Sequence, residues 1–288
     1  MPTPIALAII GGSGLYHMPG LEQPTEHNPE TPFGRPSAPI VVGGLEGQRV
    51  AFLARHGIGH HISPTEVNYR ANVYALKALG AERIVSISAC GSLREDYAPG
   101  HIVIPDQIFD NTTSRARSFF GEGWVAHISV ADPFCPDLSN QLEAAVRAAG
   151  ATVHRGGTFI TIEGPRFSTK AESNAYRTWG MSIIGMTTSP EAFLAREAEM
   201  CYSVMAHVTD YDVWHVSAAP VTVDIVIETL NRNTHLAQEA VRLLVRRLNT
   251  TRDCNCGSAL ATALITDPAR IPESTKQKLN LLAGKYLK

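Results

Sequence analysis

Residues 8–17 read AIIGGSGLYH, an apolar run that stops abruptly in glycines. The run over residues 5–10 is typical of a buried β-strand, and the glycines at 11–14 leave backbone N–H groups free to contact an anion. A dinucleotide loop would need G-x-G-x-x-G, but His17 occupies the last position, and the lysine of a nucleoside triphosphate loop is missing. Two interpretations remain: a site for a smaller anion, such as free phosphate, or an ordinary tight turn.

Short apolar runs and helical patterns alternate along the rest of the chain. The runs are rich in valine and isoleucine and nearly continuous in apolarity, as in a sheet that is covered on both faces. We therefore predict an α/β fold, a single domain with a central mixed β-sheet flanked by helices. The expected strands cover residues 50–54, 83–88, 101–104, 158–162, 182–184 and 202–208.

Capping signals predict where the helices begin. Ser63 and Glu66 have capping-box spacing, and Pro64 suits the first turn of a helix. We therefore expect a helix from there to residue 79, ending at Gly80. The longest expected helix covers residues 222–248, and its apolar residues recur in steps of four and three, which places them on one face. The other expected helices cover residues 136–149, 170–179, a segment beginning at 189, and two short helices after residue 256.

The composition argues against several classes of function. The chain has 288 residues, 18% of them charged, and a formal net charge of −2, so no general basic charge attracts nucleic acid or an anionic membrane. No apolar stretch reaches the ~18 residues of a transmembrane helix, and the N-terminus lacks the basic region of a signal peptide. We expect a cytoplasmic protein with no nucleic-acid and no membrane partner.

The five cysteines divide into two groups. Cys90, Cys135 and Cys201 lie in apolar context and are expected to be small core side chains. Cys254 and Cys256 form a C-x-C pair, for which a local disulfide and a redox pair both remain open. We expect no structural zinc site, because such a site needs two more ligands and the sequence shows none nearby.

Polar clusters follow several expected strands, at the ends where open α/β sheets bind ligands. Arg55 and His56 combine a guanidinium with an imidazole, which suits phosphate, although an exposed turn is the alternative. Residues 88–92 form a second small-residue loop with backbone N–H groups to offer. Residues 209–212 carry two aspartates, for which a metal pair, a pair that binds a polar ligand and a simple turn are all open.

Two more segments suggest ligand contacts. Residues 161–168 end a strand with Phe167, an aromatic side chain that suits stacking on a ring, or simply packing in a corner. Residues 185–191 place hydroxyl groups before a helix N-terminus, which is either an anion site or an ordinary cap.

Taken together, nine motifs occur in the order of a known family. The chain resembles the trimeric purine nucleoside phosphorylases, and in detail it is most similar to their methylthioadenosine phosphorylase branch. The resemblance covers about residues 8–248 and implies the purine nucleoside phosphorylase-like fold. The motifs are GGSGL, TPFGRPS, ARHG…H, VNYRAN, ACGSLRE, DPFCP, TIEGPRFS…AES, GMTTSPE and TDYDVW.

The resemblance implies phosphorolysis of 5′-methylthioadenosine to adenine and 5-methylthioribose 1-phosphate, in purine and methionine salvage. Inorganic phosphate is then a co-substrate, and no metal or organic cofactor is implied. The implied catalytic residues are Asp210, Asp212 and His56, with protonated Asp210 bonded to purine N7. The implied phosphate ligands are Ser13, Arg55, His56, Ser88, Ala89 and Thr187. The implied substrate contacts are Met186, Phe167, Ser168, Asp210, Tyr211, Asp212, Val223 and, from a neighbouring subunit, His127.

Three positions favour an adenine base with a methylthio group. Enzymes of the family that act on 6-oxopurines carry asparagine, glutamate and histidine where this chain has Asp210, Ser168 and Val223. The aspartate suits an amine donor, Ser168 supplies no carboxylate for an N1–H, and valine suits an apolar 5′ group. A phosphorylase for adenosine, inosine, guanosine or methylthioinosine is the alternative enzyme. A non-catalytic nucleoside-binding protein and a nicotinamide oxidoreductase are the alternatives from other classes.

The resemblance also implies an organisation and an assembly. We expect a nucleoside phosphorylase domain over residues 1–250 and a helical C-terminal extension over 251–288, packed on the same domain. The family places its site at a subunit interface, which implies a homo-oligomer, either a trimer or a hexamer. The C-x-C pair resembles that of archaeal thermophile members, where it is a disulfide.

Overall fold

The computed structural model describes residues 4–11, 18–216, 221–249 and 251–287. Eleven strands in this part of the chain form one mixed sheet, which confirms the predicted fold class. The main path runs β2-β3-β4-β1-β5-β10-β9-β7, while β11 pairs with β5 and β6, and β6 with β8. The strands are β1 (Leu7–Gly11), β2 (Glu22–His27), β3 (Ile40–Leu45), β4 (Gln48–Ala54), β5 (Arg83–Ser92), β6 (Ile102–Ile104), β7 (Gln107–Asn111), β8 (Val153–Arg155), β9 (Thr158–Ile162), β10 (Ile183–Gly185) and β11 (Cys201–Asp210).

The centre of the sheet is β5, which pairs with three strands. It runs parallel to β1 and β11 and antiparallel to β10. The prediction of a loop over residues 88–92 is therefore wrong, because the strand continues through this segment. Cys90 pairs with Val208 of β11, and Gly91 pairs with Ile184 of β10. Pairing on both sides outweighs the weak strand preference of small residues.

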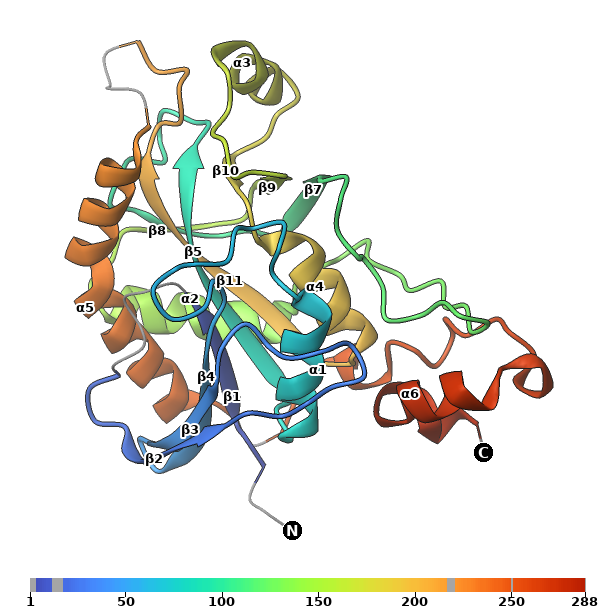
Figure 1. Cartoon of the computed structure of the whole chain (residues 1–288). Helices are drawn as coiled ribbons and strands as arrows, with labels where there is room; N and C mark the ends of the chain where they lie inside the picture. The colour runs from blue at the N-terminus through green and yellow to red at the C-terminus, as the bar shows by residue number, and fades with distance from the viewer. Residues whose placement is uncertain (1–3, 12–17, 217–220, 250, 288) are drawn as a thin grey trace.

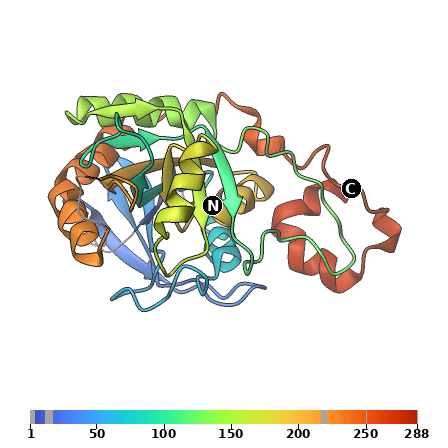
Figure 2. The same ribbon diagram turned by 90° about the horizontal axis from the view of Figure 1, so that it is seen from above.

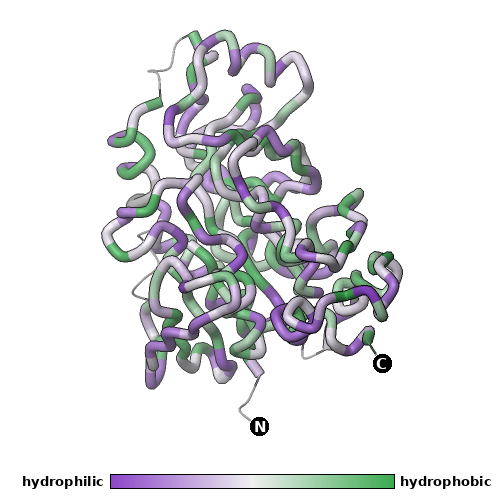
Figure 3. Tube along the Cα trace, turned by 45° about the vertical axis from the view of Figure 1, so that its right-hand side comes forward, coloured by the Kyte–Doolittle hydropathy of each residue, from purple (hydrophilic) through white to green (hydrophobic). Residues whose placement is uncertain are grey.

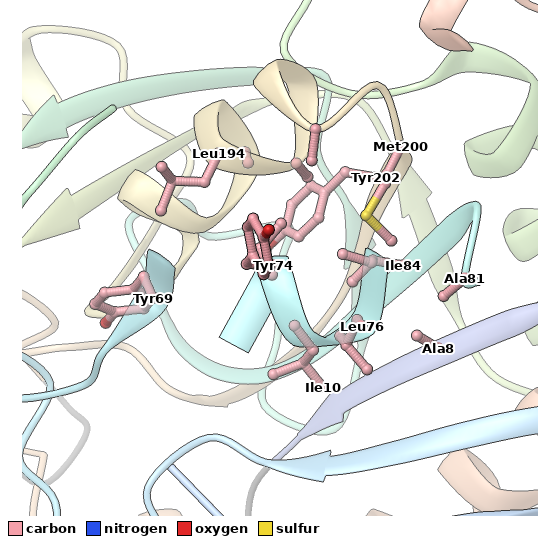
Figure 4. Close-up of a cluster of buried hydrophobic side chains, with 14 of the residues drawn as sticks. Ala8, Ile10, Tyr69, Tyr74, Leu76, Ala81, Ile84, Leu194, Met200 and Tyr202 are labelled. Carbon is pink, nitrogen blue, oxygen red and sulfur yellow. The ribbon is translucent and has the colours of Figure 1, made fainter. Parts of the chain in front are cut away.

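Helices cover both faces of the sheet, with α2 (Pro136–Ala148) and α5 (Val223–Arg247) on one face and α1 (Tyr69–Ala78) and α4 (Thr188–Glu197) on the other (Figures 1 and 2). Strand β1 shows why there are two cores. Its alternate residues point to opposite faces, so Leu7 packs with the α2 and α5 side chains and Ala8 with those of α1 and α4. Figure 4 shows the core on the α1 and α4 side, and Figure 3 shows apolar segments through the interior.

Helix α1 begins later than the sequence predicts. Ser63 and Glu66 do bond to each other, with 2.5 Å between Oγ and Oε2, but they close only a turn. Helix α1 starts later because Asn68 has non-helical backbone angles and its side chain accepts the Ala71 N–H as a new N-cap. In α3 (Lys170–Thr178), which lies at the end of the sheet, the capping box is complete between Thr169 and Glu172. Within the described residues, no helix is long and apolar enough to cross a bilayer.

The C-terminal extension has one α-helix rather than two. It consists of η1 (Asn255–Ser258), η2 (Pro268–Arg270), α6 (Glu273–Ala283) and η3 (Gly284–Tyr286). It lies beside the long loop between β7 and α2 at the lower right of Figure 1, and the His127 N–H donates to the Ala263 carbonyl at 2.8 Å. The buried Glu199 carboxylate accepts bonds from the Leu260 N–H and the Tyr286 hydroxyl, which anchors the extension next to the start of β11.

Candidate active site

A cavity of about 490 Å³ opens at the carboxyl ends of β5 and β11, near the arrowheads of these strands in Figure 1. This volume is within the range of small-molecule sites, and the position is where open α/β sheets bind ligands. The structure brings most of the predicted site residues to this one wall. Those that line the cavity are Arg55, His56, Ser88, Ala89, Phe167, Ser168, Met186, Thr187, Asp210, Asp212 and Val223.

Asp210 is the last residue of β11 and is only 6% exposed. Its Oδ2 accepts from the Thr209 hydroxyl at 2.7 Å, and its Oδ1 accepts from the Asp212 N–H at 2.7 Å. Burial nevertheless raises the pKa of Asp210 to about 6. Gly91 makes room for it, since a Cβ at position 91 would lie 2.9 Å from Asp210 Oδ1. The site therefore holds a carboxyl that keeps its proton in mildly acidic solution.

Asp212 lies deeper in the same wall, in a left-handed backbone conformation with φ of 50°. Burial raises its pKa, and the nearby hydroxyls of Ser168 and Ser173 oppose this effect only in part. Neither hydroxyl reaches hydrogen-bonding geometry. Within the described residues, Asp212 Oδ2 and the Ser168 hydroxyl have no partner. The cavity thus presents a buried acceptor and a buried hydroxyl to whatever ligand it takes.

Arg55 is buried, but its guanidinium is not free as the phosphate prediction supposed. Nε and Nη2 bind the two carboxylate oxygens of Glu191 at 2.9 and 3.1 Å, and Nη2 also donates to Ser86 at 2.6 Å. Among the described residues, Nη1 makes one long bond of 3.4 Å, to the Ile87 carbonyl. Arg55 therefore meets the cavity through its Nη1 side, with most of its charge compensated by Glu191.

His56 follows Arg55 and stacks on His60, with 4.3 Å between ring centroids. Its Nδ1 lies 2.9 Å from the Ile62 carbonyl, so this nitrogen carries the proton and Nε2 is the free position. Burial, together with the Arg55 charge, lowers the pKa of His56 to about 4. His56 is therefore a neutral ring at neutral pH, and its Nε2 accepts rather than donates a hydrogen bond.

Two hydroxyl groups complete the polar end of the cavity. Ser88 Oγ and Thr187 Oγ1 lie 3.4 Å apart, and both side chains are buried. Thr187 directly precedes α4, yet its hydroxyl makes no capping bond. A hydroxyl pair in front of a helix N-terminus, beside a guanidinium, suits a small oxyanion.

The part of the cavity next to the start of α5 is largely apolar, although Asn233 and Thr234 further along α5 also line the cavity. Val221 and the first turns of α5 line it with Val223, Val226 and Ile227. Val223 is 60% exposed and Ile227 50% exposed, although both are large apolar side chains. The polar and apolar ends together fit a ligand with an anion at one end and an apolar group at the other.

Comparison with known families decides the relationship. A family model described as the phosphorylase superfamily matches residues 6–246. The chain belongs to the phosphorylase superfamily. The S-methyl-5′-thioadenosine phosphorylase of Geobacter sulfurreducens is 57% identical over 282 residues, which cover 98% of this chain and 99% of that protein. The protein of the same name from Hyperthermus butylicus is 52% identical over 263 residues, 90% of this chain and 95% of that one.

Solved structures of other phosphorylases have the same fold. A methylthioadenosine phosphorylase from an antarctic soil metagenomic library superposes with a TM-score of 0.93 at 46% identity, covering 97% of this chain and 99% of that one. The methylthioadenosine phosphorylase of Schistosoma mansoni in complex with adenine gives a TM-score of 0.83 at 34% identity, with 97% and 98% covered. The purine nucleoside phosphorylase-like fold predicted from the motifs is confirmed.

Among the described residues, two predicted residues of this phosphorylase superfamily member do not line its cavity. Tyr211 turns away, and its hydroxyl donates to the Glu95 carbonyl at 3.3 Å. His127 lies beside the C-terminal extension, so it does not reach the cavity of its own chain. Ser13 lies outside the described residues. The contact of Tyr211 with substrate stays a prediction, since the Asp210–Asp212 turn contributes only the two aspartates to the cavity lining of this chain.

Sequence reasoning missed three residues of the phosphorylase site. The sequence marks Glu191 only as part of a helix start, and nothing in the pattern links it to Arg55. Buried His207 lines the cavity, and neither of its ring nitrogens has a partner among the described residues. Arg115 holds the loops that form the cavity wall. His207 and Arg115 lie in otherwise ordinary segments, and a single histidine or arginine there does not mark a site residue in the sequence.

Arg115 binds both sides of the site through backbone carbonyls. Nη1 donates to Met186 O at 2.6 Å and to Ser189 O at 2.7 Å, the segment that carries Thr187. Nη2 donates to Glu163 O at 2.7 Å, in the segment that leads to Phe167. The Arg115 side chain is 1% exposed, so its donors are spent on fixing these loops.

We expect Arg115→Met to reduce kcat/KM by about 100-fold, because a displacement of about 1 Å in positioning groups has effects of this size. The KM for phosphate should rise, since the segment around Thr187 loses two of its bonds. Steady-state kinetics with both substrates varied measures this. Arg117→Met is the matched control: Arg117 is 44% exposed, pairs with Asp110 and leaves the cavity untouched. Equal kinetics of the two variants would contradict the positioning role.

Proposed function

We propose that the protein catalyses the reversible phosphorolysis of 5′-methylthioadenosine to adenine and 5-methylthioribose 1-phosphate. The carrying observation is the composition of one cavity, which combines Arg55 and Thr187 for an oxyanion, the buried carboxyl of Asp210 and the apolar side chain of Val223. The similarity to proteins named S-methyl-5′-thioadenosine phosphorylase over nearly the full chain supports the same activity. A pentosyltransferase of this kind serves purine and methionine salvage.

Phosphate is the nucleophile in this reaction. It attacks C1′ of the ribosyl group while the C1′–N9 bond breaks, and the electron pair of that bond leaves with the purine. Glycosyl transfers of this type pass through an oxocarbenium-like state, which an anion beneath the sugar stabilises. Ser88, Thr187 and the Nη1 side of Arg55 hold the phosphate in place. Since His56 Nε2 is an acceptor in the empty site, it binds a protonated phosphate oxygen or gains a proton as phosphate enters.

Asp210 makes the purine a better leaving group. The base leaves with a pair of electrons, and a proton delivered to N7 neutralises the charge that develops. The raised pKa of Asp210 keeps this proton available in mildly acidic solution, and a bound purine excludes more water and favours the protonated form further. The hydrogen bond from the Asp212 N–H to Asp210 Oδ1 fixes the orientation of the Asp210 carboxyl group.

The unpaired groups of the cavity favour adenine over a 6-oxopurine. Asp212 Oδ2 is a buried acceptor without a partner among the described residues, and leaving such a group unpaired costs about 1–3 kcal/mol. The exocyclic amine of adenine is a donor that satisfies it, whereas the carbonyl of hypoxanthine is another acceptor. Next to α5, Val223 and Ile227 would be covered by a methylthio group, whereas these two side chains offer no hydrogen bond to a 5′-hydroxyl.

The decisive assay is base release from methylthioadenosine, adenosine and inosine, each with and without phosphate. We expect phosphate-dependent release of adenine from methylthioadenosine, weaker turnover of adenosine and poor turnover of inosine. Fast cleavage of inosine would instead support the alternative, a phosphorylase for 6-oxopurine nucleosides. No turnover of any nucleoside, with binding retained, would support a nucleoside-binding protein.

The assembly, the location and the co-substrate belong to the same proposal. We propose a homotrimer or hexamer in the cytoplasm, with inorganic phosphate as co-substrate and no cofactor in the reaction. His127 is the residue we propose for the 5′ end of a neighbouring subunit's cavity. Its position at the periphery, beside Val125, which is 44% exposed, supports a role between subunits.

A further inference from the structure

We propose that Cys135, Cys201, Cys254 and Cys256 bind one zinc ion, which fastens the C-terminal extension to the base of the sheet. The four sulfur atoms all lie within 4.8 Å of one another. Three of the side chains are buried, and Cys254 is partly exposed. The sequence-based expectation of no further ligands near the C-x-C pair is wrong, because the fold brings in two cysteines from distant segments.

The spacing of the sulfurs matches a single tetrahedral ion. With zinc–sulfur bonds of about 2.3 Å, a tetrahedron places its sulfurs about 3.8 Å apart. The Cys201 and Cys254 sulfurs are 3.4 Å apart, and the widest pair is within 4.8 Å, so small side-chain adjustments close the site. A polynuclear iron–sulfur cluster would spread its ligands further, and an all-thiolate set favours soft ions over calcium or magnesium.

Separate elements deliver the four ligands. Cys135 is the N-cap of α2, and its sulfur accepts the Leu138 N–H at 3.5 Å. Cys201 is the first residue of β11. Cys254 and Cys256 lie on either side of Asn255, where η1 begins. An ion at this point would join a helix, the central sheet and the extension, as structural zinc sites do in other proteins.

The surroundings carry the charge that such a site needs. Four thiolates around a divalent cation leave an excess of negative charge, and nearby donors stabilise it. Arg196 Nη1 lies 3.5 Å from the Cys256 sulfur, and Arg252, which pairs with Glu82 at 3.3 Å, also interacts electrostatically with Cys201 and Cys254. The Arg196 guanidinium is well placed to stabilise the negative charge of thiolates that bind a metal.

The site is separate from the catalytic cavity. It lies at the amino end of β11, and Asp210 lies at the carboxyl end of the same strand, about 30 Å away at the rise of a β-strand. Its role is therefore structural, and no step of the proposed reaction uses it. Disulfides between pairs of these four cysteines are the competing use of the same sulfurs, but a reducing cytoplasm disfavours them.

The test is the metal content of the full-length protein, purified under reducing conditions without chelator and measured by elemental mass spectrometry. We expect about one zinc ion per chain, released when the thiols are blocked with a mercurial. Protein refolded with cobalt should show the intense visible bands of a tetrahedral thiolate complex. The double variant C254S/C256S should lose the metal. Cys90→Ser, which removes the one cysteine outside the cluster, is the control and should retain it.

Three results would overturn the proposal. One is metal-free protein in which peptide mapping finds disulfides between these cysteines. Another is metal-free protein with free thiols that takes up no zinc on dialysis against it. The third is stoichiometric iron in place of zinc. If the double variant does not fold, the cobalt spectrum of the unmodified chain decides the question, because it needs no substitution.

Discussion

Replacing Asp210 with asparagine should lower kcat/KM for methylthioadenosine by about 10²–10⁴-fold, the usual contribution of a general acid. The amide keeps a hydrogen bond to N7, but it has no proton to transfer to the leaving purine. Asparagine is also the residue type that the resembled 6-oxopurine enzymes carry at this position, so the ratio of inosine to methylthioadenosine turnover should rise. Initial rates with both nucleosides at saturating phosphate measure the two effects.

Asp224→Asn is the matched control for this variant. Asp224 is an exposed acid in the first turn of α5, at the same end of the molecule, and its replacement should leave the rates unchanged. If the Asp210 variant stays within tenfold of the unmodified enzyme, another group supplies the proton.

The pH profile provides a second readout of the same substitution. Burial raises the pKa of Asp210 to about 6, so its protonated form is present below that pH and is lost as the pH rises through it. The kcat/KM of the unmodified enzyme should therefore decline above about pH 6, because this parameter reports the free enzyme. This decline should be absent from the asparagine variant, whose side chain does not titrate. A profile shared by both proteins would assign the decline to another group.

Replacing Glu191 with leucine should lower the free energy of unfolding by about 3–5 kcal/mol, the typical cost of removing one partner of a buried ion pair. Glu191 is fully buried and bonds to Arg55 through both carboxylate oxygens, so the variant leaves an uncompensated guanidinium in the core. Chemical denaturation monitored by tryptophan fluorescence measures the loss.

Phosphate should restore part of that stability. An anion bound next to Arg55 compensates the charge that Glu191 no longer balances, and a ligand that binds only the folded state stabilises it by mass action. The increase with phosphate should be larger for the leucine variant than for the unmodified protein. Tyr202→Phe is the control, since it removes only one hydroxyl, which donates to the same carboxylate at 2.8 Å, and should cost about 1 kcal/mol. Equal losses in the two variants would show that the Arg55 charge is not buried in solution.

The buried parts of the fold were predictable because their strands are apolar on both faces. All seven expected strands are present, from β1 to β11. The strands that were not predicted lack this continuous apolar pattern. Strand β2 reads EQPTEH and is exposed at the edge of the sheet, while β3 carries two glycines in its centre. Such segments form strands because a neighbour pairs with them, and that information is not local.

The site was predictable to the extent that it depends on strand ends. Arg55, Ser88 and Asp210 each follow or end a recognisable strand, and the topology brings those ends together. The partners of these residues come from elsewhere. Glu191 is 136 positions from Arg55, and Cys135 and Cys201 are far from the C-x-C pair, so only the folded chain shows that they meet.

Arg115 has a consequence for how the site opens. Its guanidinium spans the two halves of the cavity, with the carbonyls of Met186 and Ser189 on one side and that of Glu163 on the other. Neither half can move outward unless its hydrogen bonds to the Arg115 guanidinium break, and that guanidinium also holds the other half. Local opening of the segment that carries Thr187 and of the segment that leads to Phe167 is therefore a single cooperative event. Amide protons on both segments should exchange with solvent at matching free energies. One buried side chain thus makes the entry of the two substrates interdependent.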